Sequence, residues 1–116
     1  MITGKNEKNF KAWLEKNWYV YSQGFDDTLR DFEQWGVYQK YYDTLDIYIS
    51  VNREEFWDDF KGYEGFSNKI LVREKSKEPL RSMHYTGATN LFPTRDSAWK
   101  DLLVRANEEA NKKFRK

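Results

Sequence analysis

A seven-residue stretch near the middle of the chain, 45-LDIYISV-51, decides the fold class. Apolar and polar or hydroxylated positions alternate strictly along it: Leu45, Ile47, Ile49 and Val51 are interleaved with Asp46, Tyr48 and Ser50. This period of two is typical of a half-buried β-strand, because successive side chains of a strand point to opposite faces. The stretch therefore predicts a strand with one face on a core.

Downstream of this strand the pattern changes. Asn52 followed three residues later by Glu55 resembles a capping box and predicts a short helix whose core-facing residues are Phe56, Trp57 and Phe60. Gly62 and Gly65 predict the loop that ends this helix.

Two further strands are predicted over 69–76 and 80–85, joined around 77–79. Pro79 cannot donate a ladder hydrogen bond, so it indicates an edge strand or a strand start. Thr94 then predicts the N-cap of the last helix. The apolar residues of that helix form one continuous stripe: Ala98, Trp99, Leu102, Leu103, Ala106, Ala110 and Phe114.

Upstream of the strand, two helices are expected. Asn6 predicts the cap of a helix that runs to about Asn17 and buries Phe10, Trp13 and Leu14. A second helix starts at Asp26 or Asp27, and it either stops at Gly36 or continues to Tyr41.

The order of elements is thus α-α-β-α-β-β-α, without a repeated βαβ unit. We expect an α+β fold in which a small, mainly antiparallel sheet of about three strands is packed by the N-terminal helices and a long C-terminal helix. At 116 residues the chain has the size of one domain, so residues 1–116 are predicted to form a single domain.

Composition limits the chemistry. The absence of Cys excludes disulfides and thiolate chemistry and indicates a reducing compartment. The N-terminal sequence has no apolar signal region and no stretch has the length of a membrane span, so a cytoplasmic location is expected. No phosphate-loop, dinucleotide-binding or catalytic motif is present, and no cofactor is predicted.

The candidates for catalysis have simpler explanations. His84 is the single histidine, and on a strand it is best explained as a solvent-facing or hydrogen-bonded side chain. The acidic pairs Asp26-Asp27, Glu54-Glu55 and Asp58-Asp59 are best explained as solvated helix surface. We therefore expect a protein that is not an enzyme.

Charge is distributed unevenly along the chain. Residues 1–60 hold 7 Lys or Arg and 12 Asp or Glu, whereas residues 61–116 hold 13 and 7. The first part has a net charge of −5 and the second +6. Whether the molecule is also two-sided in space depends on the fold.

The leading functional hypothesis is a protein-binding module. Phe, Trp and Tyr make up 18% of the chain, more than a small core holds, so some rings must be exposed. The residues expected at the contact surface are Tyr19, Tyr21, Tyr38, Tyr41 and Tyr42. Exposed aromatic rings and acidic residues favour binding to another protein, and self-association through the oppositely charged parts is a variant.

The alternative is a nucleic-acid-binding protein. The basic hairpin over 69–81 and the C-terminal helix carry clustered cations, and the hairpin candidates are Lys69, Arg73, Lys75, Lys77 and Arg81. Few aromatic residues accompany this hairpin in the sequence, which counts against base stacking unless folding brings the two parts together.

The segment from Phe92-Pro93-Thr94 through Ala98-Trp99 to Leu102-Leu103 resembles the closing helix of many short uncharacterised proteins encoded by bacteria and their phages. The resemblance is confined to the C-terminal part of the chain. It implies a small accessory or inhibitor protein that acts by binding, and it transfers no catalytic residue.

Overall fold

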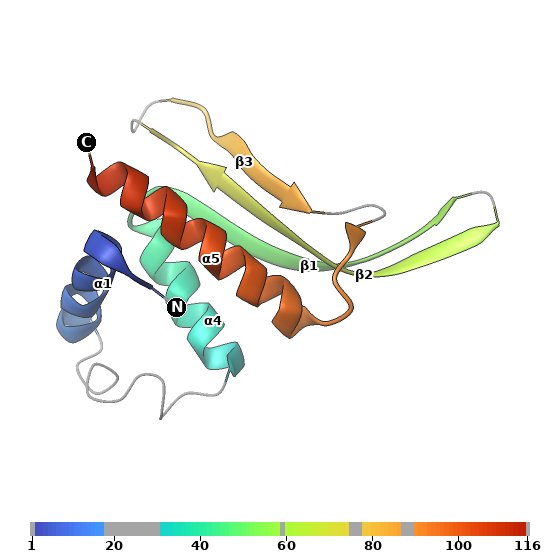
Figure 1. The fold of residues 1–116 in the computed structure, drawn as a ribbon, viewed down its shortest axis with the longest axis horizontal. Helices are drawn as coiled ribbons and strands as arrows, with labels where there is room; N and C mark the ends of the chain where they lie inside the picture. The colour runs from blue at the N-terminus through green and yellow to red at the C-terminus, as the bar shows by residue number, and fades with distance from the viewer. Residues whose placement is uncertain (1, 18–30, 59, 75–77, 87–89, 116) are drawn as a thin grey trace.

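The fold was analysed in a computed structural model that describes residues 2–17, 31–58, 60–74, 78–86 and 90–115. The α+β class is confirmed (Figure 1). In chain order the elements are α1 (Gly4–Asn17), α4 (Asp31–Asp43), β1 (Ile47–Asp58), β2 (Lys61–Val72), β3 (Arg81–Thr86) and α5 (Arg95–Phe114).

The sheet is antiparallel and has the strand order β1-β2-β3. β1 and β2 pair over their full length, from Ile47 opposite Val72 to Asp58 opposite Lys61. β3 pairs with the C-terminal part of β2, with a register shift after Ile70. β3 is an edge strand, as Pro79 predicts.

One face of the sheet carries the core. Its fully or almost fully buried residues are Ile47, Ile49, Ile70 and Val72. α4 contacts β1, and α5 contacts both β1 and β2. The two helices also meet each other, because the rings of Trp35 and Trp99 stack with their centroids 5.5 Å apart.

The last helix forms as its sequence predicts. Thr94 is the N-cap, and its hydroxyl accepts a hydrogen bond from the Ser97 amide at 3.0 Å. The predicted stripe is buried at Ala98, Trp99, Leu102, Leu103, Ala106 and Ala110, whereas Phe114 is half-buried at the end of the helix.

The first helix begins earlier than predicted, because α5 caps it. Gly4 opens α1 with a φ of 68°, and the amides of Thr3 and Asn6 donate to the side chains of Asn107 and Asn111 at 3.1 and 3.0 Å. Asn6 is therefore not the N-cap. Its side chain is fully buried inside the fold.

The predicted helix over 52–60 is wrong. Residues Asn52 to Asp58 continue β1, and Gly62 and Gly65 lie within β2 rather than in a loop. The reason is the partner strand, since each residue from Asn52 onward lies opposite a residue of β2. A local capping pattern is weaker than this continuous ladder.

Two other boundaries differ or are decided. α4 continues through Gly36 to Asp43, and its start at Asp26 or Asp27 lies outside the described residues. β2 ends at Val72, four residues before the predicted end of that strand.

The molecule is elongated because the β1–β2 hairpin extends beyond the helices. Its radius of gyration is 15.6 Å, where about 13 Å is usual for a compact chain of this length. The principal extents are 52 × 36 × 20 Å. The projecting part of the hairpin, residues 53–65, is called the arm (Figure 1).

Candidate functional site

The tyrosines predicted to form a contact surface are core residues where the structure describes them. Tyr38 is 5% exposed, and Tyr41 and Tyr42 are fully buried, so the expectation that they are exposed is wrong. Their rings pack against α1, with Phe10 and Tyr41 in an edge-to-face contact at 5.0 Å. Tyr19 and Tyr21 lie outside the described residues.

Buried hydroxyls need partners, and here asparagine side chains supply them. The Tyr41 hydroxyl donates to Asn6 and accepts from Asn9, whose Nδ2 lies 3.0 Å away. The Tyr42 hydroxyl accepts from Asn6 Nδ2 at 3.1 Å. Burial raises the pKa of Tyr41 to about 12 and also raises the pKa of Tyr42. This tyrosine cluster is a structural unit.

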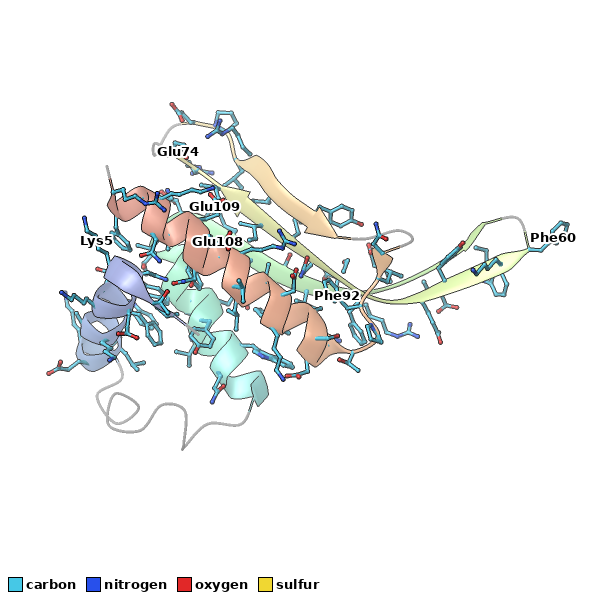
Figure 2. All side chains as sticks on the ribbon, in the orientation of Figure 1. Lys5, Phe60, Glu74, Phe92, Glu108 and Glu109 are labelled. Atoms are coloured by element: carbon cyan, nitrogen blue, oxygen red, sulfur yellow. The ribbon has the colours of Figure 1, made fainter. Side chains whose placement is uncertain are left out.

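Among the described residues, the two most exposed aromatic side chains lie instead at the end of the arm. Trp57 is 71% exposed and Phe60 is 100% exposed. The Trp57 ring lies over Gly62, where an added Cβ would come within 3.2 Å of the ring carbons. Figure 2 shows Phe60 at the extreme tip, far from the helices.

Charged residues lie along the arm between its base and this aromatic tip. Arg53 forms ion pairs with Glu64 at 3.1 Å and with Glu55 at 3.5 Å across and along the ribbon. The ammonium of Lys61 lies 5.1 Å from the centroid of the Tyr63 ring. In sequence, residues 53–64 hold five acids and two bases, so the arm has a net charge of −3.

The base of the arm is fixed to the body at one crossing. Phe66 and Phe92 exchange two backbone hydrogen bonds of 2.9 and 2.8 Å. The chain at Phe92 passes so close to β2 that a Cβ on Gly65 would lie 2.6 Å from the Phe92 carbonyl oxygen. Arg95 covers the Phe66 ring at 4.9 Å. Gly65 is therefore required where the arm leaves the body.

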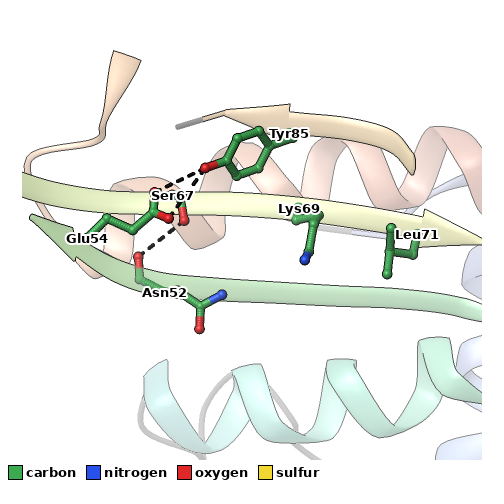
Figure 3. Close-up of a pocket in the computed structure, with 6 residues that line it drawn as sticks. All are labelled: Asn52, Glu54, Ser67, Lys69, Leu71 and Tyr85. Carbon is green, nitrogen blue, oxygen red and sulfur yellow. Dashed lines mark hydrogen bonds between the residues drawn. The ribbon is translucent and has the colours of Figure 1, made fainter. Parts of the chain in front are cut away.

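The second candidate surface is the sheet face opposite the core. Strand alternation places Tyr48, Lys69 and Leu71 on this side, because their neighbours Ile47, Ile49 and Ile70 point into the core. We call it the open face. It carries a shallow hollow of about 410 Å³. The lining residues, drawn in Figure 3, are Asn52, Glu54, Ser67, Lys69, Leu71 and Tyr85.

Both tyrosines of the open face are held by carboxylates. The Tyr85 hydroxyl donates to the Glu54 oxygens at 3.3 and 3.4 Å, and Tyr85 stays 54% exposed. The Tyr48 hydroxyl donates to Asp46 at 2.9 Å. Desolvation and the Glu54 charge raise the pKa of Tyr85, whereas the hydrogen bond to Asp46 is the main reason that the pKa of Tyr48 is raised. Both phenols are neutral donors at neutral pH.

The predicted basic hairpin is partly described. Lys69 lies on the open face, Arg73 follows the end of β2, and Arg81 opens β3 with an ion pair to Glu74 at 3.4 Å. Lys75 and Lys77 lie outside the described residues.

The end of α5 joins this hairpin, since Lys113 Nζ donates to the Arg73 carbonyl at 2.8 Å. Lys5 Nζ donates to the Phe114 carbonyl at 3.4 Å on the same helix end. These contacts gather a basic pole made of Lys5, Arg73, Lys112, Lys113 and Arg115. The pole lies opposite the arm tip, as the positions of Lys5 and Phe60 show in Figure 2. Glu74, Glu108 and Glu109 lie at the same end of the molecule in Figure 2, so this end carries charges of both signs, whereas the arm is net acidic.

The structure adds little to the catalytic candidates. The backbone of His84 lies opposite Ile70 in the sheet, and Glu54 belongs to a strand rather than a helix. Among the described residues no group of three or more His, Asp or Glu is placed to hold a metal ion. The helices that the structure describes include none that is long and apolar enough to cross a membrane.

Sequence reasoning missed Trp57 and Phe60 as surface residues because it assigned them to a buried helix face. A signal was present. The two acids of Asp58-Asp59 stand between the aromatic runs Phe56-Trp57 and Phe60-Lys61-Gly62-Tyr63, an arrangement typical of a hairpin tip.

Family models, curated proteins and solved structures were all compared with this chain, and none matches it. The function is therefore inferred from the residues of the chain itself.

Proposed function

We propose that this protein is a non-enzymatic binding module that inserts the tip of its arm into a pocket of a partner protein. The observation that carries the proposal is the exposure of Trp57 and Phe60, 71% and 100%, at the end of a projecting β-ribbon. Contact of large apolar side chains with water is unfavourable, so burying these two rings in a partner's pocket would lower the free energy of the complex.

The arm is suited to this role by its order before binding. Both strands are paired up to Asp58 and Lys61, and Gly65 and Phe92 hold the base. A preordered element loses little conformational entropy on binding. Aromatic side chains are also the residue types that most often dominate interface energetics.

The charge of the arm selects the kind of partner. With a net charge of −3, the arm favours a partner surface whose apolar pocket is rimmed by Lys or Arg. An accessory or inhibitor protein of a bacterium or phage, as the C-terminal resemblance implies, would act through such a contact.

The test is capture of a partner from a lysate of cells that contain the protein, using three immobilised forms: wild type, Trp57→Ala/Phe60→Ser and Val104→Ala. Val104 is an exposed apolar residue on α5, 39% exposed, and serves as the matched control. We expect the wild type and Val104→Ala to retain the same stoichiometric protein and the arm variant to lose it.

The captured protein is then purified and titrated. We expect Trp57→Ala to weaken its binding by about 30-fold, as removal of a central aromatic anchor does. A partner that binds the arm variant as tightly as the wild type would refute the proposal. Sedimentation of the wild type and the arm variant tests self-association. If only the wild type forms dimers and they dissociate at high salt, the arm binds the basic pole of a second copy rather than a different protein.

A further inference from the structure

The open face combines cations and aromatic rings in a pattern that the sequence does not show. Lys69 lies opposite Tyr85 on β3 and opposite Ser50 on β1. Leu71 lies opposite Tyr48. Folding thus brings a tyrosine from the acidic part of the chain and a tyrosine from the basic part to the same surface, on either side of β2.

The spacing of these side chains suits an extended polymer. Tyr48 and Tyr85 are separated by two strand spacings and two residues along the strands, or roughly 12 Å between backbone positions. Lys69 and Leu71 lie between them on β2, so a cation and an apolar side chain separate the two rings.

The groups on this face are available. In the part of the chain that the structure describes, the Lys69 ammonium has no hydrogen-bond or ion-pair partner. Tyr85 is 54% exposed, and its hydroxyl donates to Glu54 across the hollow (Figure 3).

Arg73 adds a second cation at one end of this face. It follows the end of β2, and its charge acts on the Tyr48 phenol. The remaining cations of the basic pole, on α1 and α5, belong to the helix layer on the other side of the sheet. The opposite end of the open face carries Glu54 and continues into the acidic arm. A bound polyanion would therefore extend from Arg73 past Lys69 and stop near Glu54.

From these observations we propose that the open face binds single-stranded nucleic acid, with bases stacked on Tyr48 and Tyr85 and the phosphate backbone contacted by Lys69 and Arg73. Aromatic platforms beside a positive groove are how sequence-tolerant single-strand binders work. This activity uses side chains other than those of the arm tip, because Tyr48, Lys69 and Tyr85 lie on the body of the sheet, whereas Trp57 and Phe60 lie at the end of the ribbon.

Single strands are favoured over duplexes. A duplex hides its base faces, so the two rings would contribute nothing to its binding.

The test uses purified protein and fluorescein-labelled 12-nucleotide oligo(dT) and oligo(U), with a 12-base-pair duplex of mixed sequence for comparison, read by fluorescence anisotropy at 50 mM salt. The assay contains no partner protein, so its result does not depend on the protein contact that we propose for the arm tip. We expect the single strands to bind at least about tenfold tighter than the duplex, as stacking on two rings predicts.

Four variants locate the site. Tyr85→Ala is expected to weaken single-strand binding by about tenfold, whereas Tyr85→Phe keeps the ring and binds like the wild type. Lys69→Gln is expected to make the negative slope of log affinity against log salt shallower by about 0.7, because one phosphate contact is lost. Val104→Ala on α5 is the neutral control.

Glu54→Gln gives a further check, since removing a negative charge from the hollow should tighten binding about twofold. Equal binding of the duplex and the single strands, or full binding by both Tyr85→Ala and Lys69→Gln, would overturn the proposal. So would the absence of any binding at 50 mM salt.

Discussion

Tyr41 in the tyrosine cluster is fully buried, whereas Phe60 at the arm tip is fully exposed, although both belong to the aromatic-rich part of the chain. The cluster can be buried because its hydroxyls form hydrogen bonds with asparagine side chains and the Tyr41 ring packs against Phe10. The arm residues are exposed because their ribbon runs past the helices. Aromatic content therefore does not predict which rings are exposed. The position of each ring relative to the helices determines whether it belongs to the core or to the surface.

The largest expected difference between these two regions is in stability. Tyr41→Ala should lower the free energy of unfolding by about 3–5 kcal/mol, because it empties a large volume in the core. Trp57→Ala should change it by no more than about 0.5 kcal/mol, since its ring is mostly in water. Urea unfolding followed by circular dichroism measures both. Equal losses would mean that the arm is part of the core.

Alkaline pH should act on the cluster next. The folded-state pKa of Tyr41 is raised from 10.0 to about 12, and that of Tyr42 is raised too, so the folded protein holds these protons more tightly than the unfolded chain. Their stability contribution is complete below about pH 10 and is lost as the pH rises toward 12. Urea midpoints at pH 9, 10 and 11 should fall in that order. The double variant Tyr41→Phe/Tyr42→Phe should show a flatter profile, and an unchanged profile would contradict the assignment.

The junction between body and arm gives a third comparison. Gly65→Ala should cost about 1–3 kcal/mol, since its Cβ would lie 2.6 Å from the Phe92 carbonyl oxygen and the backbone must shift. Gly36→Ala, in α4 with no atom within 4 Å of the added Cβ, should instead stabilise by about 0.5–1 kcal/mol. Thermal unfolding of the two variants tests the opposite signs. A neutral Gly65→Ala would show that the crossing at Phe92 is loose.

A smaller loss than that of Tyr41→Ala is expected when only one buried hydroxyl of the cluster is removed. Tyr42→Phe removes the acceptor for Asn6 Nδ2, which keeps its bond to Asn107 Oδ1 at 2.9 Å. The cost should be about 1 kcal/mol, typical of one buried hydrogen bond. Denaturant unfolding measures it. A loss as large as that of Tyr41→Ala would mean that the asparagine network, rather than ring packing, holds the cluster together.

Sequence patterns correctly predicted those helices and strands in which buried side chains recur at a regular spacing. The strand alternation is confirmed from Ile47 to Val51, with Leu45 in the turn before β1. The stripe of α5 is confirmed from Ala98 to Ala110. The helix predicted at Asn52 rested on one local capping pattern, and the ladder to β2 replaced it.

The candidate site was predicted less well. Tyr38, Tyr41 and Tyr42 were expected at the surface, yet they form the core against α1. The exposed rings of Trp57 and Phe60 were assigned to the core because exposure depends on how far the hairpin extends past the helices. That extension is a property of the assembled layers and leaves no trace in the period of the sequence.

By itself, the sequence determined the α+β class, the cap and stripe of the last helix, the absence of cysteine chemistry and the opposite charges of the two parts of the chain. Tertiary structure alone decided which aromatic rings face water, where the basic residues gather and that Tyr48 and Tyr85 share a face. The physical reason is the sequence separation over which each property is set. Helix and strand periods arise from neighbouring residues, whereas exposure and charge clustering arise from contacts such as Lys113 with Arg73, which lie far apart in the chain.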